Sequence, residues 1–173
     1  MMGESLLELL AEVSVTLAGF AGVVAAFSSR RDDRWTALDV LRFLNMLWSS
    51  LMALVLSIAT LVLLHVGLME ETTWLVSSLL MIGLLLPLLV WSLRQLTRVS
   101  RLHPGEYSPW ISGLVFAVMI GAIALQVLNA GDWWVDRGFG PYIAGLVALI
   151  LLCIIMFERL LSAVLRRGHA DRI

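Results

Sequence analysis

The chain has 173 residues, of which 60% are hydrophobic and only 14% are charged. A soluble domain of this size carries about a quarter of charged residues, so the composition indicates an integral membrane protein. The net charge of −1 excludes a basic surface for nucleic acid, and the single cysteine, Cys153, excludes an intrachain disulfide.

Five apolar stretches are long enough to cross a membrane. A bilayer core of about 30 Å requires about 20 apolar residues of helix. The stretches lie at about residues 8–27, 38–66, 74–93, 110–128 and 141–162. We therefore expect an all-α, polytopic transmembrane helix bundle with five spans, which forms a single domain over residues 1–173. Before the second stretch, Thr36-Ala37-Leu38-Asp39 fits a capping box in which Asp replaces the usual Glu or Gln.

The first stretch separates into a large side and a small side at about 100° per residue. Ala18, Gly19 and Gly22 fall on the small side, in line with Glu8 and Glu12. Small residues mark packed helix faces because they let backbones approach closely inside a membrane. We expect the small side to face protein or water and the large side to face lipid. The large side consists of Leu10, Val13, Leu17, Phe20, Val24 and Phe27.

Later stretches carry similar small residues. The fourth has a ladder of Gly113, Ala117 and Gly121, and the fifth has Ala144 and Ala148. The third is rich in Leu, so we expect it at the periphery of the bundle. We expect the first, second, fourth and fifth helices to contact one another or copies of themselves, which favours a homo-oligomer.

Arginine placement predicts the orientation of the chain. With five spans, Arg137 is the exception among the twelve Arg residues, and the others fall on one side of the membrane. Basic residues are enriched on the cytoplasmic side, so we expect the N-terminus outside and the C-terminus in the cytoplasm of a bacterial inner membrane. The aromatic residues agree, with Trp35, Trp91 and Trp110 at inner ends and Trp74, Trp133, Trp134 and Tyr142 at outer ends.

An outer polar layer is the first place where function could reside. Glu8 and Glu12 lie near the outer end of the first helix and His65 near that of the second, while Gln126 and Asn129 lie near that of the fourth. A carboxylate beside an imidazole can bind a cation or relay a proton, and ionisable groups inside membranes are costly. We name Glu8, Glu12 and His65 as a candidate ion or proton site. The alternative is that Glu12 lies about one turn below the headgroups and only caps the bundle. Gln126 projects opposite the ladder of the fourth helix, which argues against one converging site.

An inner charged layer is the second candidate. It is formed by Asp39, Arg42, Arg94, Arg98 and Glu158. Glu158 shares a face with small residues of the fifth helix, so we expect it to point inward toward an Arg. Such residues are usually paired or extend toward the headgroups. We therefore interpret the layer as a structural collar of ion pairs at the cytoplasmic end.

Catalytic and cofactor motifs are absent from the sequence. It contains no Gly-rich phosphate loop and no HExxH. His65 and His103 are predicted on opposite sides of the membrane, so ligation of a haem by two histidines is not expected. No set of acid, base and nucleophile stands out. We expect a chain that is not an enzyme and that binds no cofactor and no metal.

The run from Leu17 to Val24, LAGFAGVV, is followed by an Arg-rich turn and Trp35. It resembles the start of a group of small bacterial multi-pass membrane proteins of unknown function. The resemblance covers about the first third of the chain and implies no activity.

The sequence thus favours a membrane subunit without enzymatic activity that assembles with itself or with another membrane protein. The alternative is a homo-oligomeric cation channel or transporter, with the first helix lining the path. Acidic residues predominate over the single Arg137 in the segments expected outside, which would attract cations to the entrance.

Overall fold

The computed structural model describes residues 2–29, 35–102, 108–133 and 137–170, and these form five α-helices. They are α1 (Met2–Ser29), α2 (Ala37–His65), α3 (Glu70–Leu102), α4 (Pro109–Gly131) and α5 (Phe139–Ala170). All five are long and apolar enough to cross a membrane. The prediction of an all-α bundle with five spans is confirmed, and the protein is a multi-pass membrane protein.

The helix ends follow local sequence signals. At the start of α2 the Thr36 hydroxyl accepts a hydrogen bond from the Asp39 backbone N–H at 3.3 Å, and the Asp39 carboxylate accepts one from the Thr36 N–H at 3.1 Å. The predicted capping box is therefore present. α4 ends where Asp132 adopts a left-handed conformation with φ 56°. α3 continues through Pro87 and is longer than the apolar stretch at 74–93.

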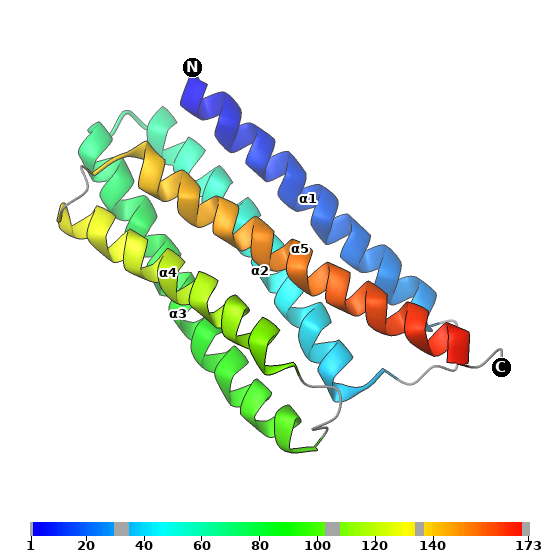
Figure 1. The fold of residues 1–173 in the computed structure, drawn as a ribbon. Coiled ribbons are helices and arrows are strands. Elements are labelled where there is room, and N and C mark those ends of the chain that lie inside the picture. The colour runs from blue at the N-terminus through cyan, green and yellow to red at the C-terminus, as the bar shows by residue number, and fades with distance from the viewer. Residues whose placement is uncertain (1, 30–34, 103–107, 134–136, 171–173) are drawn as a thin grey trace.

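The five helices lie side by side, with the two ends of the chain at opposite ends of the bundle (Figure 1). α2 and α5 lie at the centre and contact each other. Among the described residues, α1 contacts only these two helices, whereas α3 contacts α2, α4 and α5. The expectation that α3 lies at the periphery is wrong, because it buries Met81, Leu85 and Leu88 in the core. The two peripheral helices are α1 and α4, each of which contacts only two others among the described residues.

The predicted lipid side of α1 is also wrong over its first half. Leu10 is buried in the core, and Val13 and Leu17 pack against it. Phe20 does lie outside, with 54% of its surface exposed. Core and lipid are both apolar, so large side chains can face either one, and size alone does not distinguish them.

Candidate functional site

One buried polar cluster joins α2, α3 and α5 near the end of the bundle where α1 begins. The Thr60 hydroxyl lies 2.7 Å from the Tyr142 oxygen and 3.0 Å from that of Ser77. Tyr142 donates in turn to the backbone carbonyl of Leu56 at 3.0 Å. Tyr142 is therefore buried rather than placed in the interfacial belt that the sequence predicted. The cluster fixes α5 against α2.

A second buried polar cluster fixes α4 against α3 and the start of α5. Ser78 donates to Gln126 Oε1 at 3.0 Å, and Asn129 Nδ2 donates to Ser78 Oγ at 2.8 Å. Gln126 Nε2 donates to the Pro141 carbonyl at 2.9 Å, and Asn129 Oδ1 accepts from the Gly138 N–H at 3.0 Å. Gln126 and Asn129 are buried, and both ends of each amide have partners. Their role is structural.

The structure does not bring the predicted ion-site residues together with these amides. Glu8, Glu12 and His65 are all exposed, and His65 Nδ1 lies 2.8 Å from the Leu61 carbonyl of its own helix. No group of three or more His, Cys, Asp or Glu within the described ranges could hold a metal ion. Glu12 is exposed on α1, so the expectation that it faces protein or water stays a prediction.

The small residues expected to pack helices within the chain are mostly uncovered. Ala18 and Ala148 are half-buried. The residues that remain exposed are Gly19, Gly22, Gly113, Ala117, Gly121 and Ala144. A Cβ atom added at any of the four glycines among them would meet nothing within 4 Å. These exposed residues therefore do not pack on other helices within the described chain, and packing on copies of the chain, the other alternative, stays a prediction.

The tight glycine is Gly145, which sequence reasoning missed. A Cβ atom there would lie 2.5 Å from Gln126 Nε2 and 2.6 Å from Met81 Sδ. Gly145 thus allows α5 to approach α4 and α3 closely. The sequence does not distinguish Gly145 from its neighbour Ala144, because the atoms that would collide with a side chain at Gly145 belong to other helices.

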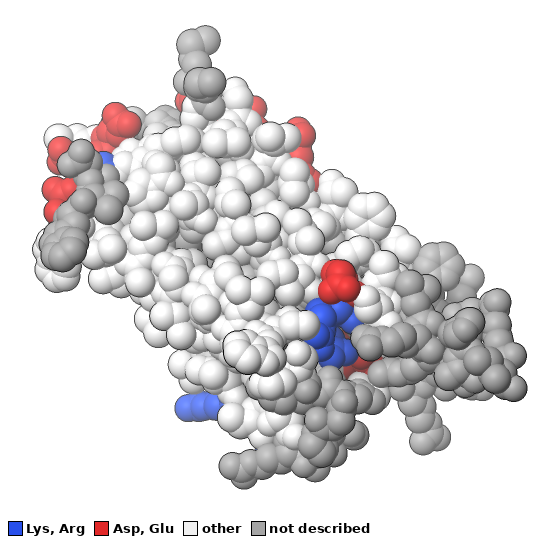
Figure 2. All heavy atoms as spheres, in the orientation of Figure 1, with Lys and Arg blue, Asp and Glu red and all other residues white. Residues whose placement is uncertain are grey.

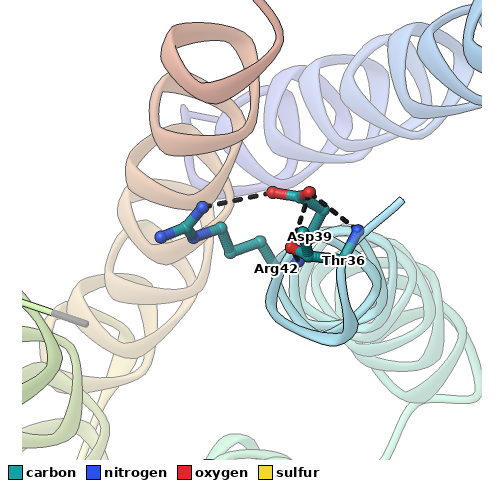
Figure 3. Close-up of polar contacts among 3 residues, drawn as sticks. All are labelled: Thr36, Asp39 and Arg42. Carbon is teal, nitrogen blue, oxygen red and sulfur yellow. Dashed lines mark hydrogen bonds and ion pairs between the residues drawn. The ribbon is translucent and has the colours of Figure 1, made fainter. Parts of the chain in front are cut away.

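The predicted inner charged layer contains one ion pair among the described residues, that of Asp39 and Arg42. Arg42 Nη1 lies 3.3 Å from Asp39 Oδ1, and Asp39 Oδ2 accepts from the Thr36 hydroxyl at 2.7 Å (Figure 3). Arg94 and Arg98 are exposed. Glu158 does not point inward as expected, because it is exposed and accepts a hydrogen bond from Ser162 at 2.8 Å.

Beside the ion pair is a hollow between α2, α3, α4 and α5. It contains about 560 Å³ of space not filled by atoms, its open mouth included. Arg42 and Arg159 contribute its basic side chains. Figure 2 shows basic side chains set into the surface at this end of the bundle, next to acidic ones. The sequence did not indicate the hollow, since its lining comes from four helices.

Comparison with protein-family models, with curated proteins and with solved structures found no match for this chain.

Proposed function

We propose that the chain is a membrane subunit without enzymatic activity that assembles with copies of itself through the outer face of α1. This outer face consists of Glu8, Glu12, Gly19, Gly22 and Ala26, all of which are exposed. The observation that carries the proposal is the position of the Glu12 carboxylate. It lies within an apolar span, on the same side as two glycines that no part of the described chain covers.

Contact with the hydrocarbon of the bilayer is unfavourable for this face. Glu12 lies about 15 Å along the helix axis from Met2, at 1.5 Å per residue. A carboxylate facing hydrocarbon is costly and therefore favours a polar or protein environment. Gly19 and Gly22 offer a backbone surface on which another helix can pack closely.

A second copy of the chain fits this face better than an unrelated partner. α1 contacts only α2 and α5 among the described helices, so its outer side stays accessible along the span. Two copies of α1 would bring small surface against small surface, as a self-complementary interface requires. The carboxylates would then be shielded from lipid.

Native mass spectrometry in mild detergent tests the proposal. We expect an oligomer that the double variant Gly19→Leu, Gly22→Leu converts to monomer. Both glycines have open space beyond Cα, so the fold of the single chain should tolerate the change. Gly83→Leu is the matched control, because Gly83 is also exposed and unobstructed but lies on α3. A wild-type chain that is monomeric without any co-purifying protein argues against self-assembly.

We further infer a bacterial inner membrane, with the N-terminus outside and the Arg-rich end in the cytoplasm. Arg42, Arg94, Arg98 and Arg159 all belong to the end of the bundle where α1 ends, and Arg137 belongs to the other. This asymmetry supports the orientation. Reporter fusions at the two termini should give opposite compartments, and a cytoplasmic N-terminus would refute the orientation.

A second candidate function is a path for cations along the shared outer faces. The observation that favours it is that Glu8 and Glu12 recur at helical spacing on the face that carries Gly19 and Gly22. Copies arranged around an axis with this face inward would present rings of carboxylates, which attract cations. In proteoliposome flux assays, Glu12→Gln should lower cation flux, whereas Glu158→Gln should not. If neither wild type nor Glu12→Gln gives measurable flux of any common cation, this function is excluded.

A further inference from the structure

The hollow at the Arg-rich end differs from the outer face of α1 in both position and chemistry. It lies between four helices and is partly open to the outside of the bundle. Basic side chains are set into the surface at the Arg-rich end of the bundle (Figure 2). The α1 proposal does not use any residue of its lining.

The charged side chains of the lining are Arg42 and Arg159. Arg42 extends from α2 toward α5 (Figure 3), is 9% exposed and is held by Asp39. Arg159 on α5 is half-buried and makes no hydrogen bond or ion pair with any group in the described ranges. Arginine that is partly withdrawn from water requires an anionic partner.

The first turn of α4 adds hydrogen-bond donors to the same wall. Ser108 and Ser112 line the hollow, and the side chain of Ser108 makes no capping hydrogen bond. The N-terminal end of a helix carries partial positive charge from its unpaired N–H groups, which favours phosphate. This wall reinforces the charge of the two arginines.

Apart from Asn45 and Ser92, which form a hydrogen bond of 2.6 Å with each other, the remaining lining is apolar. Phe116 on α4 and Met156 on α5 are among its members, and both also pack on the hydrophobic core. A small inorganic anion would leave these walls without a partner. A lipid would place its phosphate at the arginines and part of an acyl chain along Phe116 and Met156.

We propose that this hollow binds the phosphate headgroup and the upper acyl chain of an anionic phospholipid from the leaflet at the Arg-rich end. The lipid would lie between α2, α3, α4 and α5 and would connect the ion pair of α2 to Arg159 of α5. Arginine provides planar, paired donors that match the geometry of a phosphate. The ligand is thus defined by one negative headgroup together with one apolar tail.

Native mass spectrometry of the full chain tests the proposal, with micelles that contain phosphatidylglycerol or phosphatidylcholine of the same acyl chains. We expect wild type to retain phosphatidylglycerol preferentially. Arg159→Gln removes the unpaired charge and should weaken phosphatidylglycerol binding by about fivefold, with little effect on phosphatidylcholine. Arg98→Gln is the matched control, since Arg98 is exposed at the same end but does not line the hollow. Equal loss in Arg159→Gln and Arg98→Gln would overturn the proposal.

A second pair of variants tests the hollow without altering charge. Ser112→Leu fills the hollow from α4 and should also reduce retention of phosphatidylglycerol. Gly113→Leu adds the same side chain on the exposed side of α4 and should not. An excess of inorganic phosphate should leave lipid binding unchanged because phosphate makes no use of the apolar walls. Displacement of the lipid by inorganic phosphate would refute the proposal of a lipid site and would show that the hollow binds a free anion. Equal retention of the two lipids by wild type would contradict the proposal outright.

Discussion

The hydroxyl groups of Tyr142 on α5 and Thr60 on α2 lie 2.7 Å apart, and both side chains are buried. This hydrogen bond joins the two central helices of the bundle at one end. The ion pair of Asp39 and Arg42 lies on α2 near its other end. Between these levels, the described cores of α2 and α5 are held together mainly by apolar side chains.

Tyr142→Phe should destabilise the bundle by removing one interhelical hydroxyl. The variant deprives Thr60 of a partner and the Leu56 carbonyl of a donor. Interhelical hydrogen bonds in membrane proteins contribute about 0.6 kcal/mol on average and up to about 1.7 kcal/mol. We expect a loss near the upper value, measured by reversible unfolding in detergent. Thr16→Val is the control, because the Thr16 hydroxyl bonds only to the Glu12 carbonyl of its own helix. Equal effects of the two variants would show that Tyr142 does not join the helices.

Gly145→Ala should destabilise the bundle although it adds only one methyl group. The new Cβ would collide with Gln126 Nε2 and Met81 Sδ. Gln126 cannot move freely, because it is held by Ser78 and by the Pro141 carbonyl. Overpacking of a tight core costs about 1–3 kcal/mol, and thermal unfolding in detergent would report it. Gly121→Ala adds the same methyl group on the open side of α4 and should be neutral or slightly stabilising. The prediction fails if both alanines have the same effect.

Asp39→Asn should weaken the bundle by removing the negative charge that pairs with Arg42 at 3.3 Å. The Asp39 side chain is buried and serves both the capping box and the ion pair. Removing one partner of a buried pair costs about 3 kcal/mol or more because a charge stays buried. Chemical unfolding of Asp39→Asn, Arg42→Gln and the double variant measures the coupling. The double variant should be less destabilised than the sum of the two single variants, and strict additivity would disprove the pair.

The spans could be predicted from sequence because membrane thickness sets helix length almost independently of the neighbours. The capping box at Thr36 and Asp39 is equally local, since all of its atoms lie within four residues. The spacing also predicts that Gln126 lies opposite the small residues of α4, and Gln126 is indeed buried where those residues are exposed.

The neighbours of each helix could not be predicted from the same pattern. Leu10 and Leu17 are equally suited to lipid and to a protein core, so the pattern assigns the lipid side of α1 wrongly over the first half of the helix. Gly145 and the lining of the hollow depend on atoms contributed by other helices far away in the sequence. Small residues such as Gly19 and Gly22 mark a close approach without specifying whether the partner is the same chain.

Disulfide crosslinking in intact membranes tests the assembly through α1 most directly. In a Cys153→Ala background, which removes the single native thiol, Gly22→Cys places a thiol on the outer face of α1. Gly83→Cys places a thiol at an exposed position of α3 and is the matched control. Self-assembly predicts that Gly22→Cys forms a covalent dimer on oxidation while Gly83→Cys remains monomeric. A monomer for Gly22→Cys, or equal crosslinking at both positions, would contradict it.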